Sequence, residues 1–255
     1  MDLGIGGRRA AVAAGTAGLG LGTARALVAE GVHVAVCGRD PDRLAAAVED
    51  LRARAAGGAV VAGLEADLAS PSAAAEFARG AAEVLEGPLD IVVPNAGGPP
   101  PGTFADTDLD GYRAALETNC LATVELCRAT VPGMQQRGWG RVVAITSIGA
   151  RQPIDYLMAS STARAATTAF LKVLSTEVAP DGVTVNNLQP GLHATARVLE
   201  MSEEATAENR AGIPAGRAGD PDDFGAVAAF LCSQQASFVT GVGLHVDGGA
   251  FRGLQ

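Results

Sequence analysis

The sequence lacks the residue patterns that mark several large classes of protein. Its four cysteines lie far apart with no C-x-x-C spacing, and its three histidines are scattered. We therefore expect neither a metal site nor a disulfide framework, and this cysteine usage is typical of a reducing cytosol. Lys and Arg form no block, and the net charge of −9 argues against nucleic acid or an anionic membrane as a partner. A cytoplasmic protein is expected.

Long apolar runs are also missing, and none could span a bilayer. Arg8 and Arg9 precede an apolar stretch that could suggest a signal peptide. Glycines interrupt that stretch repeatedly, however, and a strand, a loop and a helix explain it better. Aromatic residues are few, whereas alanine and glycine are abundant. Besides compositional bias, this composition suits close packing of helices on a sheet.

What the sequence does contain is a regular alternation of strand and helix patterns. Strands are predicted at 9–14, 32–37, 60–64, 89–93, 141–146, 183–188 and 243–246, and helices at 19–30, 41–56, 70–85, 108–136, 162–178 and 221–232. Repeated β–α units predict an α/β fold, a single-domain Rossmann-type doubly wound parallel sheet with helices on both faces. No linker divides residues 1–255, and 195–215 is expected to be a helical lid over a site.

A glycine-rich turn, A-G-T-A-G-L-G-L-G, joins the first predicted strand to the first predicted helix. Such a turn brings backbone N–H groups and the helix dipole to a pyrophosphate. A tight turn made only for close packing is the alternative. The second predicted strand ends in C-G-R-D, and Asp40 followed by Pro41 fits a helix N-cap.

Together with later motifs, the turn makes the chain resemble the short-chain dehydrogenase/reductase family, and its 3-oxoacyl-ACP reductases in particular. The end of the family's T-G-x-x-x-G-x-G loop is matched by G-L-G, although Ala13 and Ala14 stand where Thr and the first Gly are usual. Further matches follow in the family's order: D-L-A-S from Asp67, N-A-G-G from Asn95, a helix asparagine at Asn119, T-S ending at Ser147, P-G-L-H-A-T from Pro190, and the C-terminal R-A-G-D-P-D-D-F and T-G-V-G-L-H-V-D-G-G.

The resemblance implies a bound nicotinamide nucleotide. The residues expected to hold it are Gly15, Thr16, Ala17, Gly18, Leu19, Gly20, Arg39, Asp67, Leu68, Asn95, Ala96, Gly97, Arg164, Pro190, Gly191, His193 and Thr195. NAD enzymes end the second strand with an acid that binds the ribose 2′-hydroxyl, whereas an arginine suits a 2′-phosphate. Arg39 therefore favours NADP(H), with an exposed loop charge as the alternative.

The family's catalytic set is Asn, Ser, Tyr and Lys, with the last two spaced Y-x-x-x-K. In the family, the lysine lies 13 residues before the glutamate of an E-x-A-P-x-G segment, which reads E-V-A-P-D-G from Glu177 here. The same spacing aligns Arg164 with the lysine, and Ser160 then aligns with the tyrosine. Ser147 then lies 13 residues before Ser160, within the family's usual spacing. The alternative register aligns Tyr156 with the tyrosine, but it pairs that residue with Ser160 and needs a four-residue insertion.

These substitutions change the expected chemistry. A serine hydroxyl is far less acidic than tyrosine, whose pKa lies near ~10, and an arginine stays protonated and cannot relay a proton. Tyr156 could supply the missing acid if a helix begins near Asp155, because Tyr156, Ser160 and Arg164 would then share one face. Otherwise Tyr156 only lines the pocket mouth or a subunit contact. His193 lies in the expected nicotinamide loop, where its imidazole could reach a substrate, but a loop histidine without a visible partner is more often structural. Cys120 and Cys127 are interpreted as core residues.

The catalytic candidates are Asn119, Ser147, Tyr156, Ser160 and Arg164. The expected function is an NADP(H)-dependent oxidoreductase that interconverts a carbonyl and an alcohol in a small-molecule substrate. A non-redox enzyme on the same scaffold (a cyclase, isomerase or lyase) and a nucleotide-binding protein without turnover remain alternatives, because fold alone does not choose among them. The resemblance also implies a homo-oligomer, a tetramer or dimer, that pairs helices 108–136 and 162–178 and packs strand 243–246 across a second axis. Small apolar residues suit the helix contact: Ala163, Ala166, Ala169 and Phe170.

Overall fold

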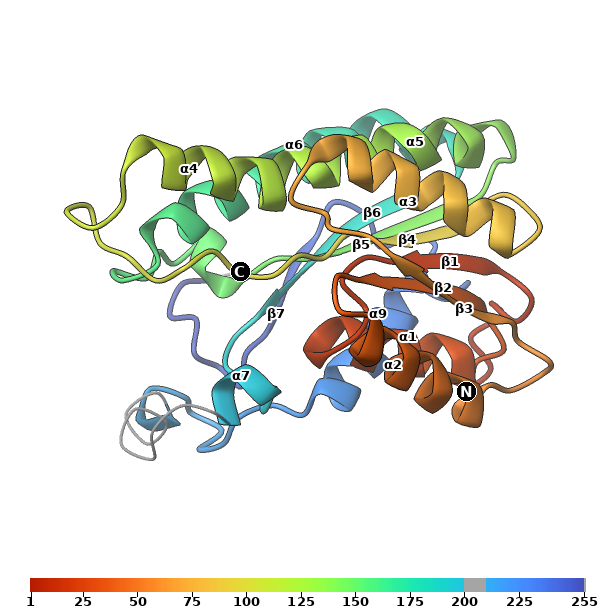
Figure 1. Cartoon of the computed structure of the whole chain (residues 1–255), viewed down its shortest axis with the longest axis horizontal. Helices are drawn as coiled ribbons and strands as arrows, with labels where there is room; N and C mark the ends of the chain where they lie inside the picture. Colours follow the sequence, from red (N-terminus) through yellow and green to blue (C-terminus); the bar gives the residue numbers. More distant parts are fainter. Residues whose placement is uncertain (200–209, 255) are drawn as a thin grey trace.

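A computed structural model describes residues 1–199 and 210–254 and builds them around one seven-stranded sheet (Figure 1). The strands are β1 (Arg9–Val12), β2 (His33–Gly38), β3 (Val61–Glu65), β4 (Ile91–Val93), β5 (Gly140–Ile145), β6 (Val183–Pro190) and β7 (Gly243–Val246). Their order is β3-β2-β1-β4-β5-β6-β7, and every pairing is parallel. The predicted doubly wound parallel sheet is confirmed.

Helices cover both faces of this sheet. In Figure 1, α1 (Gly18–Ala29), α2 (Pro41–Arg54) and α9 (Pro221–Cys232) lie below it, and α3 (Pro71–Val84), α4 (Leu109–Leu116), α5 (Ala122–Gln136) and α6 (Met158–Val178) lie above it. A short helix, α7 (Ala196–Leu199), follows β6. Each face has its own apolar cluster, because side chains alternate between the two faces of every strand. Strand β4 and the interiors of β1 and β2 are apolar, as is typical of parallel sheets. Strand β6 is buried as well, but it contains the polar residues Asn186, Asn187 and Gln189.

The lower helices show how local sequence sets an element's ends and spacing. Asp40 accepts hydrogen bonds from the backbone N–H groups of Asp42 and Arg43, so the predicted N-cap of α2 is confirmed. Helices α1 and α9 pack backbone to backbone at Gly22 and Gly225. A Cβ atom on either glycine would collide with main-chain atoms of the opposite helix.

The long helix predicted at 108–136 is not uniform. It consists of α4, a π-helical turn (Glu117–Leu121) and α5. A π turn adds one residue to a helix and widens it locally, and such turns are frequent at functional sites. Asn119 lies within this turn.

Several predicted boundaries were wrong by two residues or more, and two of them have a clear physical cause. The helix predicted from 162 begins at Met158, because Ala159 and Ala163 pack against Tyr112 and Leu116 of α4, a contact that sequence periodicity does not reveal. The first strand ends at Val12, before residue 14, because the chain turns at Ala14 with φ of 46°. The smaller 3₁₀ turns at 148–150 and 179–181 were not predicted.

The segment expected to be a lid is described only at its ends. Helix α7 opens it, and residues 200–209 lie outside the described residues. At its far end Ile213 is buried, and the N–H of Ala215 donates to the carbonyl of Gly248 after β7. Within the part of the chain that the structure describes, no helix combines the length and apolar character needed to cross a membrane.

Candidate functional site

The sequence motifs converge because each follows the carboxyl end of a neighbouring strand. The glycine-rich turn follows β1, the N-A-G-G segment follows β4, Ser147 follows β5 and the P-G-L-H-A-T segment ends β6. These four strands are adjacent and parallel, so the segments meet at one edge of the sheet. Ligands of open α/β sheets bind in this position.

The glycine-rich turn is tightly built around its glycines. Gly18 has φ of 55°, and a Cβ atom on it would lie 3.2 Å from the Thr195 methyl group. A Cβ atom on Gly20 would collide with the Ala14 carbonyl and the Asn95 amide, and that amide donates to the same carbonyl at 3.3 Å. The structure therefore brings the segments after β1, β4 and β6 into contact.

This turn fits the phosphates of a dinucleotide. Helix α1 starts at Gly18 with no side chain capping its N-terminus, so its first backbone N–H groups face the turn. At Gly97 a Cβ atom would meet nothing within 4 Å, which leaves the backbone after β4 open to close approach by a ligand. Ala14 adopts the left-handed conformation in the place where the family has a glycine.

The end of β2 carries polar groups that suit a ribose phosphate. Arg39 lies 3.8 Å from the carboxylate of Asp67, and both side chains are more than half exposed. The Thr16 side chain lies against Gly38, directly before Arg39, since a Cβ atom on Gly38 would touch its hydroxyl oxygen at 2.9 Å. Leu68 is buried beside this corner.

Arg164 is the most connected of the catalytic candidates. Its Nη1 atom donates to the carbonyl oxygens of Ile145 and Thr146 at 3.2 and 3.0 Å, and its Nη2 atom donates to the carbonyl of Ala96 at 3.4 Å. The side chain is buried, with only 8% of the residue exposed. The guanidinium therefore ties the end of β5 to the segment after β4.

Three serines lie directly after β5 or in the first turn of α6, and the sequence reasoning identified two of them. Ser147 accepts from the N–H of Gly149 at 3.0 Å, and Ser160 is buried in the first turn of α6. Ser161 was missed. Its hydroxyl accepts from the Ile154 N–H, and a Cβ atom on Gly149 would lie 3.2 Å from the Ser147 oxygen and 3.3 Å from the Ser161 oxygen. Adjacency to Ser160 was the only signal that could have pointed to it.

Tyr156 lies outside the helix. Helix α6 begins at Met158 after an N-cap at Leu157, and the carbonyl of Tyr156 accepts from the N–H of Gly102 at 2.8 Å. The shared helical face that would align Tyr156 with Ser160 is therefore not formed. The residue is 51% exposed, on a loop next to the proline-rich segment that follows β4.

Asn119 is buried in the π turn, with 4% of its surface exposed. Its side-chain nitrogen donates to the Ala115 carbonyl at 3.3 Å, while Oδ1 is buried with no hydrogen-bond partner among the described residues. Its backbone carbonyl accepts from Thr167 at 2.8 Å and from Thr123 at 3.4 Å. Two threonine hydroxyls thus donate to the backbone carbonyl of Asn119.

The remaining candidates are packed groups. His193 is buried, its Nδ1 atom lies 3.2 Å from the Gly191 carbonyl, and its ring meets Phe224 edge to face. Burial lowers the pKa of His193 below its usual value, despite the opposing effect of that carbonyl. Burial raises the pKa of Cys37, Cys127 and Cys232 to about 12, which makes them poor nucleophiles.

Comparison with known proteins gives matches along nearly the whole chain. The family model described as "Enoyl-(Acyl carrier protein) reductase" matches residues 13–250. An acetoacetyl-CoA reductase of Allochromatium vinosum is 34% identical over 96% of this chain and 98% of its own. The 3-oxoacyl-[acyl-carrier-protein] reductase FabG of Aquifex aeolicus is 31% identical over 98% and 100%. The structure of L-sorbose reductase from Gluconobacter frateurii, complexed with NADPH and L-sorbose, has a TM-score of 0.92 and 31% identity, with both chains fully covered.

Proposed function

The chain belongs to the short-chain dehydrogenase/reductase family, and from this we propose that it is an oxidoreductase that uses NADP(H) to interconvert a carbonyl and an alcohol. The observation that carries the proposal is the convergence of a glycine turn, Asn95 and Thr195 at the carboxyl edge of the sheet. These residues would hold a nicotinamide nucleotide, which would supply the hydride for reduction of a substrate carbonyl. The relatives named as reductases support the same chemistry.

The preference for NADP(H) rests on the end of β2. The Arg39 guanidinium and the Thr16 hydroxyl both lie at the end of β2, where they would hold a ribose 2′-phosphate, because a guanidinium binds phosphate through two parallel hydrogen bonds. The NADPH in the L-sorbose reductase complex supports this choice. Asp67 forms a loose ion pair with Arg39 and would turn to the adenine when nucleotide binds.

The catalytic roles proposed here follow from the contacts. Ser147 and Ser160 donate hydrogen bonds to the substrate oxygen, and Asn119 lines the buried side of the site. Arg164 holds the ends of β4 and β5 in place and supplies positive charge beside the nicotinamide ribose. Tyr156 is kept as the proposed proton donor, because serine and arginine cannot fill that role near neutral pH. It would have to act from the loop before α6, without the shared helical face that the sequence predicted.

The proposal is tested by two measurements on the same protein. NADPH and NADH are titrated by calorimetry, and a panel of ketones is then screened for substrate-dependent loss of the reduced nicotinamide absorbance. We expect tighter binding of NADPH and turnover of at least one ketone. Tight binding of NADPH without hydride transfer to any member of a broad panel would contradict the redox proposal.

A second candidate is a non-redox reaction on the same scaffold, such as isomerisation or lyase chemistry. The guanidinium of Arg164 favours it, since three backbone carbonyls already hold this group in place. Two serine hydroxyls near a fixed cation can polarise a carbonyl without any hydride. Substrate conversion at unchanged nicotinamide absorbance would identify this reaction class.

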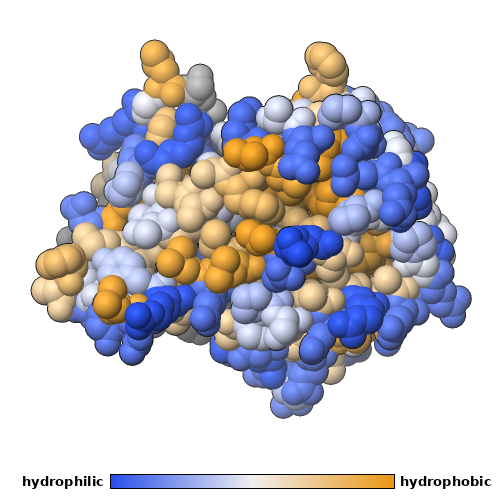
Figure 2. All heavy atoms as spheres, turned by 90° about the horizontal axis from the view of Figure 1, so that it is seen from above, coloured by the Kyte–Doolittle hydropathy of each residue, from blue (hydrophilic) through white to orange (hydrophobic). Residues whose placement is uncertain are grey.

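A homo-oligomer is also proposed. Exposed apolar side chains on the upper helices include Leu121 and Val173, which are 46% and 69% exposed. Figure 2 views the molecule from above and shows apolar residues gathered across the middle of this face. Ala166 and Ala169 are exposed on α6 and suit close helix contact, whereas Ala163 is fully buried and cannot contribute, contrary to the sequence-based expectation. We also propose that residues 1–255 form a single domain and that residues 195–215 form a lid over its site.

A further inference from the structure

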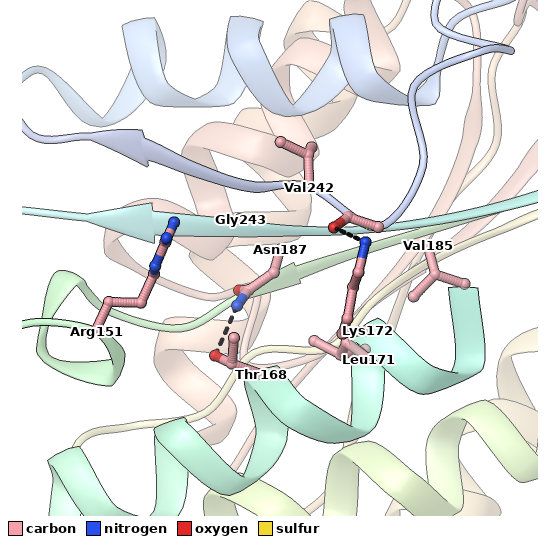
Figure 3. Close-up of a pocket in the computed structure, with 9 residues that line it drawn as sticks. Arg151, Thr168, Leu171, Lys172, Val185, Asn187, Val242 and Gly243 are labelled. Carbon is pink, nitrogen blue, oxygen red and sulfur yellow. Dashed lines mark hydrogen bonds between the residues drawn. The ribbon is translucent and has the colours of Figure 1, made fainter. Parts of the chain in front are cut away.

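A cavity of about 270 Å³ lies between helix α6 and strand β7 (Figure 3). Its volume is near the lower end of the ~300–1,000 Å³ range of small-molecule sites. Within the described ranges, none of the residues that line it belongs to the catalytic or cofactor candidates. It is therefore a separate site on the same molecule.

Two cations line this cavity. Arg151 extends from the turn after β5, and Lys172, the single lysine of the chain, extends from α6. In the view of Figure 3 both reach toward β7, with Asn187 between them. Lys172 donates to the Gly241 carbonyl at 3.2 Å, and the Arg151 guanidinium lies 5.6 Å from the Phe251 ring centre.

Neither cation is neutralised by a carboxylate. Among residues 1–199 and 210–254, the ion pairs include neither Arg151 nor Lys172. Both therefore present an uncompensated positive charge, although the chain as a whole carries a net charge of −9. Two cations beside one cavity repel each other, and an anion bound between them would attract both and offset that repulsion.

A fixed amide completes the polar side of the cavity. Asn187 donates to the Thr168 hydroxyl at 2.9 Å and accepts from the Thr146 hydroxyl at 2.6 Å. Thr168 in turn donates to the carbonyl of Arg164 at 2.8 Å. These bonds hold the amide in one orientation and use one of its two N–H groups, so a second donor remains for a ligand.

The other walls are apolar. Leu171 and Val185 lie below the Lys172 ammonium group in Figure 3, and Val242 borders the opposite side. We propose that this cavity binds a small organic anion, a carboxylic acid or a phosphate monoester. Its acidic group would bind Arg151, Lys172 and Asn187, and its carbon atoms would contact Leu171 and Val185.

The test is calorimetric titration with inorganic phosphate and, separately, with butyrate. The protein is saturated with NADPH so that the cofactor turn is filled, and sodium chloride keeps the ionic strength constant. We expect at least one probe to bind, and the tighter one identifies the acidic group that the site prefers. Lys172→Gln and Arg151→Gln should each weaken it about tenfold or more, the loss expected for one charge-assisted hydrogen bond.

Arg128→Gln is the matched control, because Arg128 is an exposed cation of α5 paired only with Glu125 among the described residues. It should leave the affinity unchanged. The proposal would be overturned if neither phosphate nor butyrate released more heat than a titration with sodium chloride. It would also be overturned if all variants bound the probe with equal affinity, or if binding appeared only without NADPH. A change of particle mass in Lys172→Gln at unchanged affinity would assign this surface to contact between copies and would also overturn it.

Discussion

Ala14 shows how one residue can depart from a family pattern at a measurable cost. It has φ of 46°, where a side chain costs about 1–2 kcal/mol relative to glycine. Its carbonyl accepts from Asn95, so the conformation is required by the site and is not a local accident. The chain therefore keeps a strained alanine at the centre of its cofactor turn.

Replacing this alanine should stabilise the protein. Ala14→Gly removes the strain but gives the unfolded chain about 0.4–1 kcal/mol of extra conformational entropy, so the net gain should be about 0.5–1 kcal/mol. Urea denaturation without nucleotide measures it. Ala13→Gly is the control, because Ala13 is buried without a positive φ and should lose stability. Equal losses for both variants would refute the strain argument.

Arg39 determines the expected choice of nucleotide. Arg39→Ala should weaken NADPH binding by about 1–3 kcal/mol, the cost of losing hydrogen bonds to a charged group, and should barely affect NADH. Titration of both nucleotides measures the difference. Arg43→Ala, which removes an exposed neighbouring cation on α2, controls for general charge. Equal losses for NADPH and NADH would show that Arg39 does not contact the 2′-phosphate.

Tyr156 decides between the two reaction classes. If it donates the proton, Tyr156→Phe should lower turnover by about 10²–10⁴-fold without changing nucleotide affinity, the range typical of general acid catalysis. Ser160→Ala should cost less, since that hydroxyl only orients the substrate. The double change Ser160→Tyr with Arg164→Lys should raise ordinary ketone reduction, because it restores the family's pair.

Steady-state turnover rates are measured for all of these variants and for Ser147→Ala, and the rates are compared with that of the wild-type protein. Wild-type turnover in Tyr156→Phe combined with loss in Ser147→Ala would make Tyr156 only a wall residue. Polarisation by serine hydroxyls would then carry the reaction. The non-redox candidate would in that case replace the reductase.

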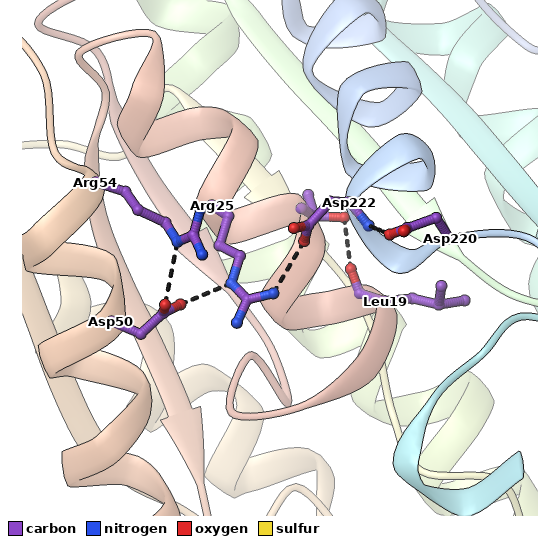
Figure 4. Close-up of polar contacts among 7 residues, drawn as sticks. Leu19, Arg25, Asp50, Arg54, Asp220 and Asp222 are labelled. Carbon is purple, nitrogen blue, oxygen red and sulfur yellow. Dashed lines mark hydrogen bonds and ion pairs between the residues drawn. The ribbon is translucent and has the colours of Figure 1, made fainter. Parts of the chain in front are cut away.

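At the scale of elements, an ion network joins the three lower helices (Figure 4). Arg25 of α1 donates to Asp50 of α2 at 2.6 Å and to Asp222 of α9 at 3.0 Å, and Arg54 donates to Asp50 at 3.1 Å. Although burial by itself raises the pKa of Asp50, the bonds from Arg25 and Arg54 lower it overall. The network fixes α1, whose N-terminus forms the cofactor turn, against its neighbours.

Breaking this network should cost stability in a pH-dependent way. Arg25→Gln should lose about 1 kcal/mol near neutral pH, since exposed pairs contribute up to ~1 kcal/mol. Because the folded pKa of Asp50 lies below its ordinary 3.8, the contribution is complete above that value and is lost as pH falls through the folded pKa. Denaturation at neutral pH and below pH ~3.8 tests both statements. Arg113→Gln, in an exposed pair on α4, should change stability by less than about 0.5 kcal/mol at either pH.

At the scale of the whole molecule, the exposed apolar side chains of Leu121 and of Ala166, Ala169 and Val173 on α6 predict self-association. Light scattering at micromolar concentration should give a mass above that of one chain, 25.6 kDa. Val173→Glu should reduce that mass, because it introduces a charge into an apolar contact. Val84→Glu on α3 is the control, since Val84 is also exposed but lies outside the proposed contact. A monomeric wild-type protein would contradict the prediction.

The same scale separates what sequence could and could not predict. The alternation of apolar strands and amphipathic helices was sufficient for the fold, and Asp40 with Pro41 fixed the start of α2, because both signals are local. The order of the motifs after β1, β4, β5 and β6 was equally readable. Parallel strands bring such turns to one edge whatever the details of packing.

By itself, then, the sequence determined the parallel sheet and the edge at which its motifs meet, and it predicts that Ser160 and Arg164 replace Y-x-x-x-K. Only the tertiary structure decided what Arg164 does, because its partners are carbonyls of β5 and of Ala96, far away along the chain. It also decided where α6 begins and that Arg151 and Lys172 border one cavity. Periodicity reports which face of an element is buried, whereas such contacts depend on which distant backbones converge once all the layers are packed.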